Sequence, residues 1–162
     1  MPRAEVVRAS YRPRKVRLLF VGESPPASGR FFYHGDSGLY RAMRDAFIAV
    51  DPTISDENFL KRFREAGCYL IDLCSRPVDD LDRASRRAAC TAAVPCLARA
   101  FAELNSDCVA TLVRSIEADV RSAASRAAWD GPLLHLPYPG RWLRHRRAFA
   151  EQLIPEIRNL LR

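Results

Sequence analysis

The stretch VRLLFVGESPP, residues 16–26, places an apolar run directly before a turn-forming segment. The first part, residues 16–22, is short, apolar and ended by a glycine, which predicts a buried strand. Gly22 is followed at once by Glu23, Ser24 and two prolines, and prolines do not continue a central strand. The sequence therefore places polar residues and a stiff loop at the end of a core strand.

Three more apolar runs follow along the chain and predict three further strands. They are CYLIDL, CVATLV and LLHL, at residues 68–73, 108–113 and 133–136. Strands that alternate with helices form parallel sheets, because right-handed crossovers place the helices on both faces. We therefore expect an α/β fold, a three-layer α-β-α arrangement around a four-stranded parallel sheet.

The segments between these runs carry apolar residues at helical spacing. The expected helices span residues 39–50, 56–66, 83–94, 95–104, 114–128 and 143–161. Pro95 is expected to separate the third helix from the fourth, and Pro155 to kink the last one. Because no linker or repeat interrupts the pattern, we expect a single domain, residues 1–162, with a basic N-terminal arm at residues 1–15.

Basic residues are concentrated in two clusters, although the net charge of the chain is only +7. Residues 1–17 hold six basic residues and one acid, and residues 141–147 hold four arginines and no acid. Such clusters favour a polyanionic partner, and nucleic acid is the commonest one. The alternative is a coding bias toward arginine, which accounts for 24 of the 26 basic residues but does not explain the clustering.

Composition argues against several other classes of protein. No apolar run approaches the roughly 20 residues of a membrane-spanning helix, and the N-terminal segment has no apolar signal core. The chain has five cysteines, an odd number that favours reduced thiols over a disulfide scaffold. We expect a cytoplasmic monomer with no membrane contact and no zinc site.

Ligands of open parallel sheets bind beyond the carboxyl ends of the strands, and three segments are expected to meet there. They are GESPPASGRFFYHGD, DLCSRP and LPYPGRW, at residues 22–36, 72–77 and 136–142. The first is not a phosphate-binding loop, because it lacks that motif and its prolines remove backbone N–H donors. A stiff loop of this kind instead holds a flat ligand or a water molecule in place.

Phe31, Phe32 and Tyr33 offer a stacking face for a nucleobase within the first of these segments. Core packing beneath the loop is the alternative for any one of them. Three consecutive aromatic residues are not expected all to face the core, however. We therefore expect at least one of them to face a ligand.

In order and spacing, the three segments resemble the uracil-DNA glycosylase superfamily. In that family a Gly-x-x-Pro loop after the first strand is followed by an aromatic residue that stacks on the flipped base. GRFFYHGDSGLY, residues 29–40, is similar to this region of the mismatch-specific uracil/thymine-DNA glycosylases. The resemblance implies Phe32 as the stacking residue, Asp72 at the position of the base-reading Asn, and residues 136–142 as the loop whose tip inserts into the duplex.

Three positions depart from the family pattern. Ser24 stands where many members have an Asp or Asn that activates water, and Asp72 replaces the Asn. Leu136 stands where the last loop has its His, and His135 lies one residue earlier. The usual catalytic groups are therefore missing or displaced.

Cleavage of an N-glycosidic bond builds positive charge on the sugar and negative charge on the departing base, so a carboxylate near C1′ assists it. Glu23 lies in the loop that should face C1′, and we expect it, or a water held by Glu23 and Ser24, to act there. Asp36 is a second candidate, with a turn or a helix cap as its alternative role. His135 is a third, with a hydrogen-bonded core histidine as the alternative.

The base is expected to contact Gly22, Phe32, Asp72 and Tyr138. An ionised Asp72 accepts from uracil N3–H but repels O4, whereas a protonated one donates to O4, and burial favours the protonated form. Selectivity should then be looser than with Asn, so that deaminated purines also become substrates. The alternative is that Asp72 faces outward or caps a helix.

The last loop and the basic cluster after it are expected to bind DNA, single- or double-stranded. Tyr138, Arg141 and Trp142 would insert into the minor groove, while Arg144, Arg146 and Arg147 hold phosphates. The alternative for Trp142 is packing of the last helix on the sheet.

Cys74 and Cys90 are sixteen residues apart, which looks like the second pair of iron–sulfur ligands in some subfamilies, but no cysteine precedes Cys68 to supply a first pair. We therefore expect no metal and no cofactor.

The only lysines, Lys15 and Lys61, are not near the expected site, which argues against a Schiff-base step. The sequence predicts a monofunctional DNA glycosylase that releases uracil or a related deaminated base in base-excision repair. The alternatives are an inactive nucleic-acid-binding relative and an N-glycosidase of free nucleosides.

Overall fold

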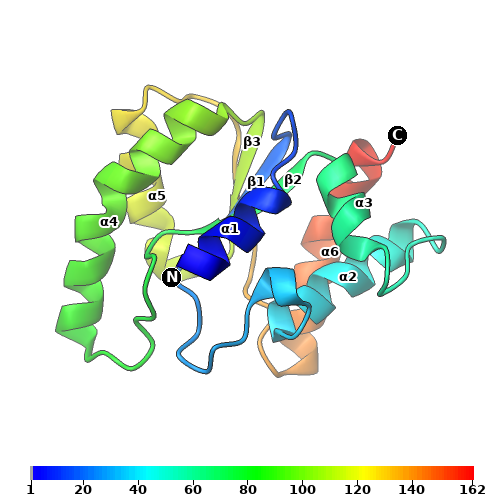
Figure 1. Cartoon of the computed structure of the whole chain (residues 1–162), viewed down its shortest axis with the longest axis horizontal. Helices are drawn as coiled ribbons and strands as arrows, with labels where there is room; N and C mark the ends of the chain where they lie inside the picture. The colour runs from blue at the N-terminus through cyan, green and yellow to red at the C-terminus, as the bar shows by residue number, and fades with distance from the viewer. Residues whose placement is uncertain (1) are drawn as a thin grey trace.

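The computed structural model describes residues 2–162 and has the expected α/β architecture (Figure 1). Four strands form one sheet in the order β2-β1-β3-β4, and every pairing is parallel. The strands are β1 Leu18–Gly22, β2 Cys68–Asp72, β3 Cys108–Thr111 and β4 Leu133–His135. Each strand lies within the apolar run that predicted it.

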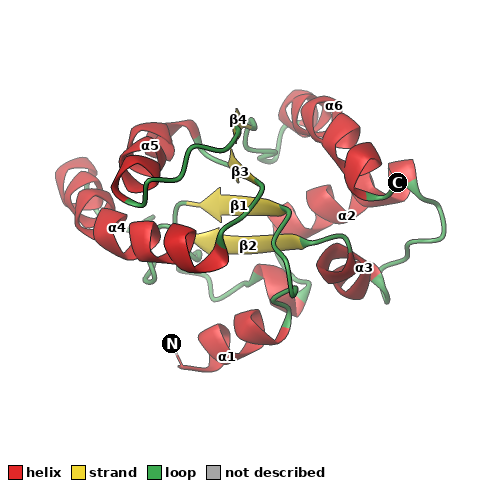
Figure 2. Ribbon diagram, turned by 90° about the horizontal axis from the view of Figure 1, so that it is seen from above, coloured by secondary structure: helices red, strands yellow, loops and turns green. Residues whose placement is uncertain are grey.

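Helices cover both faces of the sheet, which confirms the three-layer fold. They are α1 Pro2–Ser10, α2 Gly38–Val50, α3 Phe59–Glu65, α4 Arg83–Leu104, α5 Glu117–Arg126 and α6 Leu143–Leu160. Two short 3-10 turns, η1 Phe32–His34 and η2 Arg114–Ile116, complete the set. Figure 2 shows α4 and α5 on one side of the sheet and α2, α3 and α6 on the other, with α1 beyond the edge strand β2.

The strand register aligns the carboxyl ends of the sheet. Gly22 of β1 pairs with Asp72 of β2, and Thr111 of β3 pairs with His135 of β4. Val21 is the partner of Thr111 across the central pairing. The loops that follow these residues therefore leave the sheet at one edge.

The expected break at Pro95 is wrong, because α4 continues as one helix from Arg83 to Leu104 with Pro95 inside it. An internal proline removes one helical hydrogen bond. Buried residues on both sides of it, Val94 and Leu97 among them, keep this helix packed on the core, and α4 lies against α5. Tertiary packing thus outweighs the local effect of the proline.

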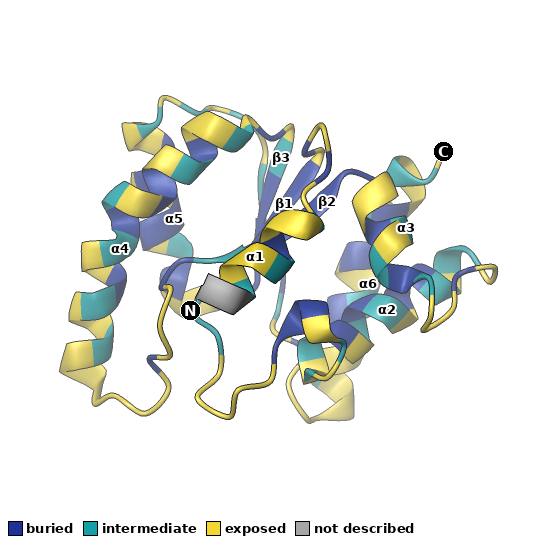
Figure 3. Cartoon of the chain, viewed as in Figure 1, coloured by how far each residue is buried: buried dark blue, intermediate teal, exposed yellow. Residues whose placement is uncertain are grey.

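The core is dominated by aromatic side chains between the sheet and the layer of α2 and α3. Phe20, Phe47, Phe59 and Phe63 are fully buried, and Phe63 lies within stacking distance of Phe20. Figure 3 shows the buried residues concentrated on the strands and on the inward faces of the helices. No helix in residues 2–162 is long and apolar enough to cross a membrane.

Phe31, Phe32 and Tyr33 are all buried, so the expectation that they could not all face the core is wrong. The η1 turn covers the exposed edge of β2, and the Phe31 and Phe32 rings both pack edge-on against the Tyr33 ring. The Tyr33 hydroxyl accepts from the Leu70 N–H at 2.7 Å and donates to the Leu70 carbonyl at 3.0 Å. It thereby satisfies backbone groups of an edge strand that has no further strand beside it.

Candidate active site

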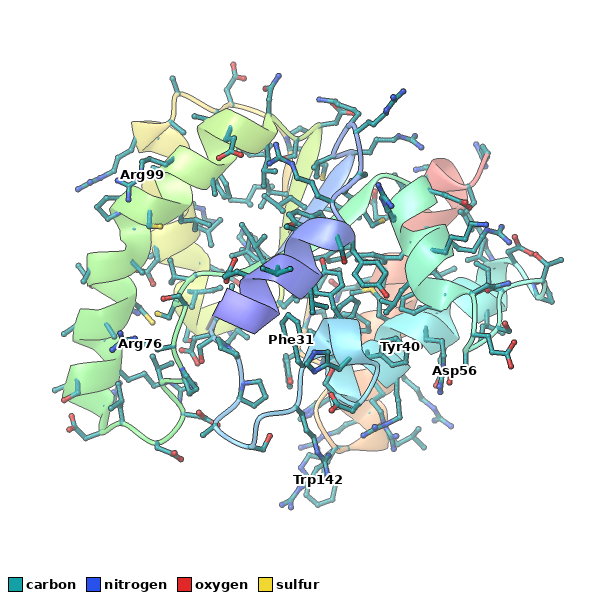
Figure 4. All side chains as sticks on the ribbon, viewed as in Figure 1. Phe31, Tyr40, Asp56, Arg76, Arg99 and Trp142 are labelled. Atoms are coloured by element: carbon teal, nitrogen blue, oxygen red, sulfur yellow. The ribbon has the colours of Figure 1, made fainter. Side chains whose placement is uncertain are left out.

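A cavity of about 370 Å³ lies at the carboxyl ends of β1 and β2, where the three predicted segments meet. Its lining includes Gly22 to Pro26 from the first segment, Asp72 from the second and Tyr138 from the last. Phe31, Phe32, Asp79 and Arg86 also line it. The volume falls within the usual range of small-molecule sites. In Figure 4, Phe31 lies near the centre of the molecule beside α1.

The loop after β1 is pinned to the loop after β2 by a series of hydrogen bonds. The carbonyls of Gly22 and Glu23 accept from backbone N–H groups of the second loop at 2.8 Å each. The Ser24 hydroxyl accepts from the Val78 N–H at 3.3 Å, and the Ala27 N–H donates to the Asp79 carboxylate. These bonds, with the two prolines, give the stiff loop that the sequence predicted.

Gly22 is required at the end of β1 because the Asp72 carboxylate occupies the space beside it. A Cβ added at Gly22 would lie 2.7 Å from Asp72 Oδ1, closer than real Cβ contacts. Asp72 is therefore neither outward-facing nor a helix cap, since it lines the cavity next to Gly22. Gly22 and Asp72 therefore both line the cavity, and their assignment to base binding stays a prediction.

Burial raises the pKa of Asp72 to about 6, and the guanidinium of Arg8 opposes this rise. Arg8 donates from its terminal nitrogen to Asp72 Oδ2 at 3.3 Å. The direction agrees with the expectation that burial favours the neutral acid. The neutral form nevertheless predominates only below about pH 6, so Asp72 is largely ionised at neutral pH.

Glu23 also lines the cavity, and its carboxylate is paired with Arg86 of α4. The Glu23 side chain is only 10 % exposed. Arg86 Nε donates to Oε2 at 3.1 Å, and a second guanidinium nitrogen donates to Oε1. A two-point Arg–carboxylate contact fixes the direction of the carboxylate.

Phe32 lies at the cavity wall but packs edge-on against its neighbours Tyr33, Tyr40 and Phe59. Phe31 lines the cavity as well, and its ring also contacts Arg8. Two buried rings therefore share the wall that the sequence assigned to Phe32 alone.

Asp36 and His135 do not belong to the cavity lining. Asp36 is exposed, and its carboxylate accepts from the Phe31 N–H at 2.7 Å, which is the turn role left open by the sequence. Arg121 donates to His135 Nε2 at 3.0 Å, and His135 Nδ1 lies 2.8 Å from the Thr111 hydroxyl. Both ring nitrogens of His135 are thus engaged away from the cavity.

The last loop is exposed beside the cavity. Tyr138 lines the cavity and is half exposed, and Trp142 is 56 % exposed with Arg141 stacked 5.1 Å from its ring centre. The alternative in which Trp142 packs the last helix onto the sheet is therefore wrong. Figure 4 shows Trp142 at the periphery of the molecule.

A second, cationic groove of about 510 Å³ lies between α2 and this loop, and it shares Tyr138 with the cavity. Its basic lining residues are Arg30, Arg41, Arg44, Arg141 and Arg146. Arg44 is paired with Asp45 and Asp56, whereas the other four arginines have no ion pair within residues 2–162. Arg144 and Arg147 are exposed on α6 but do not line the groove.

Cys74 and Cys90 lie together behind the loop after β1, with their sulfur atoms 3.8 Å apart. Both thiols are buried, and burial raises the pKa of Cys74 to about 12. Within residues 2–162 no group of three or more His, Cys, Asp or Glu side chains is placed to hold a metal ion.

Three residues of the site were not predicted from the sequence. Arg8 holds Asp72, and Arg86 holds Glu23. Asp79 holds the loop after β1. The sequence predicts Arg8 as part of a basic arm, whereas Arg8 is a buried residue of α1. Its spacing of three residues from Glu5 is the local signal for a helix there. Arg86 and Asp79 carry no such local signal, because their partners are distant along the chain.

The fold and the cavity define an α/β protein with a small-molecule-sized site at the carboxyl edge of a parallel sheet. A family model describing the uracil DNA glycosylase superfamily matches residues 9–162, so the chain belongs to that superfamily. Membership supports a DNA glycosylase type of hydrolase, with DNA as the substrate, and a role in DNA repair. No curated protein matches the chain.

Proposed function

We propose that this protein is a monofunctional DNA glycosylase that hydrolyses the N-glycosidic bond of uracil or a related deaminated base. The observation that supports it most directly is the joint placement of Asp72, Glu23 and two aromatic rings around one cavity. The base enters this cavity after it leaves the helical stack, since its glycosidic bond is out of reach within the duplex.

Asp72 recognises the base by its hydrogen-bonding edge. As an ionised carboxylate it accepts from the N3–H of uracil. Hypoxanthine and xanthine present an N–H beside a carbonyl in the same way. Because Asp72 lacks the amide donor of an Asn, selectivity for uracil is looser, and deaminated purines are substrates as well.

Glu23 acts on the sugar side of the scissile bond. Its fixed carboxylate stabilises the positive charge that develops at C1′, and it orients the attacking water together with the Ser24 hydroxyl. The reaction consumes one water and yields the free base and an abasic site.

The protruding loop and the cationic groove bind the DNA around the flipped nucleotide. Tyr138, Arg141 and Trp142 are exposed beside the cavity mouth, where a bulky wedge replaces an extruded base. Arg144, Arg146 and Arg147 contact phosphates, which makes binding dependent on salt.

The second candidate function is a DNA-binding relative without activity. It is favoured by the engagement of the Ser24 hydroxyl with Val78 and of the Glu23 carboxylate with Arg86. Leu136, at the position of the family His, is buried and has no side chain able to transfer a proton.

One experiment separates the two functions. The protein is incubated with duplex and single-stranded oligonucleotides that contain uracil, hypoxanthine or xanthine, and abasic sites are then cleaved with alkali. Strand breaks at the modified base support the glycosylase, and breaks at uracil alone contradict the looser selectivity. Salt-sensitive binding without breaks establishes the inactive relative instead.

A further inference from the structure

Arg8 reaches the wall of the base cavity from α1, outside the segments that the sequence assigned to the site. Its side chain is only 10 % exposed. It donates to Asp72 Oδ2 at 3.3 Å, forms an ion pair with Glu5, and places its guanidinium carbon 5.5 Å from the ring centre of Phe31. Arg8 therefore contacts two of the residues that line the cavity.

Stability alone does not account for this arrangement. Arg8 Nε is buried and has no hydrogen-bond partner within residues 2–162. A buried donor without a partner is unfavourable, and a buried ion pair is often no better for stability than apolar packing. The placement of Arg8 is better explained by its effect on Asp72.

The two oxygens of Asp72 have different surroundings. Oδ2 accepts from Arg8, whereas Oδ1 lies beside Gly22, where the missing Cβ leaves it space at the cavity wall. We propose that Arg8 is a positioning residue of the base cavity. It engages one oxygen of the Asp72 carboxylate and leaves the other oxygen as a single acceptor. That acceptor binds the N–H group that uracil, hypoxanthine and xanthine share. This inference rests on the proposed function and names a determinant of its selectivity in α1.

Arg8 also balances the charge that faces the departing base. The base leaves with negative charge, which an isolated carboxylate would repel. With Arg8 beside it, the Asp72 carboxylate forms part of a locally balanced pair. Loss of Arg8 should therefore lower kcat more than it raises KM, because the repulsion grows as the bond breaks.

Among residues 2–162, four titratable or charged groups face Asp72 from the elements packed around it. They are Glu5 and Arg8 of α1, Tyr33 of η1 and Tyr138 of the last loop. Arg8 lowers the pKa of Asp72, and Glu5 raises it. The two neighbours on α1 therefore act on Asp72 in opposite directions.

The test uses this opposition, with Arg8→Met and Glu5→Gln in the full chain. The readouts are the titration of the Asp72 carboxyl carbon by NMR and the pH profiles of kcat and of kcat/KM on a uracil oligonucleotide. We expect the R8M midpoint to rise by roughly one pH unit or more and the E5Q midpoint to fall. Above its midpoint, R8M should lose about tenfold in kcat, and Arg8→Lys should recover part of both effects.

A merely structural role of α1 would not give opposite shifts, because loosening of the helix would change both variants in the same direction. Arg12→Met is the control, since Arg12 pairs with Glu103 away from the cavity, and it should leave the midpoint unchanged. An unchanged Asp72 titration in R8M, or equal shifts in R8M and E5Q, would overturn the proposal. The titration needs no turnover, so a failure to release any base contradicts the glycosylase function without affecting this result.

Discussion

Arg86 holds the carboxylate of Glu23 from across the sheet edge, through two guanidinium nitrogens. Glu23 follows β1, whereas Arg86 lies in the first turns of α4, sixty-three residues further along the chain. The pair fixes the loop after β1 to α4, in the helical layer that α4 forms with α5. It also sets the direction in which the carboxylate faces the cavity.

Replacement of Glu23 by Gln should abolish most of the activity while the fold is retained. The amide is isosteric but carries no charge to stabilise the sugar cation, so we expect a loss of about a hundredfold or more in kcat on uracil DNA. Single-turnover excision, followed by alkaline cleavage of the abasic site, measures this loss.

The matched control is Glu103→Gln, which removes an exposed carboxylate that pairs with Arg12. It should excise uracil at the wild-type rate. Full activity in E23Q would exclude Glu23 as the catalytic carboxylate.

The edge of the sheet that carries the site could be predicted, because it depends on patterns that are local in sequence. The apolar run before Gly22 and the one before Asp72 each end in a polar loop, and parallel strands bring such loops together. The partners Arg8 and Arg86 could not be predicted in the same way. Their roles depend on how α1 and α4 pack against the sheet, which no short stretch of sequence specifies.

The burial of Phe31, Phe32 and Tyr33 could not be predicted from their spacing in the sequence. Alternation along a strand would expose at least one of three consecutive residues. Phe31 precedes a 3-10 turn that contains Phe32 and Tyr33, and successive side chains of such a turn point in widely different directions. Neighbouring elements cover all three directions, so all three rings are buried.

Replacement of Asp72 by Asn should change how stability depends on pH. The native pKa of Asp72, about 6, lies above the ordinary value of 3.8, so the folded state binds this proton more tightly than the unfolded state. The contribution of Asp72 to the free energy of unfolding is therefore fully present below about pH 4, and it is lost as the pH rises through about 6. Between about pH 4 and pH 7, the free energy of unfolding of D72N should therefore increase by on the order of 2 to 3 kcal/mol relative to that of the wild type.

Urea unfolding of both proteins at several pH values measures this difference. Asp107→Asn, which removes an exposed carboxylate, controls for the simple loss of one negative charge. A constant difference between D72N and wild type across this pH range would contradict the raised pKa.

Replacement of Gly22 by Ala should damage the site through a steric contact. The added Cβ would lie 2.7 Å from Asp72 Oδ1, so the carboxylate or β1 must shift, which we expect to reduce stability by roughly 1 to 3 kcal/mol. In a background with Asp72→Ala the contact is gone, and the effect of G22A should become much smaller. The comparison is a double-mutant cycle of unfolding free energies, and additive effects would show that the contact is not the cause.

The groove between α2 and the last loop should contribute to DNA affinity through Arg30 and Arg41. These two arginines face the same groove as Arg141 and Arg146, without an ion pair within residues 2–162 that would neutralise them. Each phosphate contact adds about 0.9 to the slope of log affinity against log salt on duplex DNA. The double variant with Arg30→Gln and Arg41→Gln should therefore reduce this slope by up to about 1.8.

Fluorescence anisotropy with a duplex that contains no uracil measures the slope without any turnover. Arg99→Gln is the matched control, because Arg99 is an exposed arginine of α4 and lies far from Trp142 in Figure 4. If the double variant and R99Q show the same slope, the groove does not hold the DNA backbone. A reduced slope in the double variant alone would extend the DNA-binding surface from the last loop onto α2.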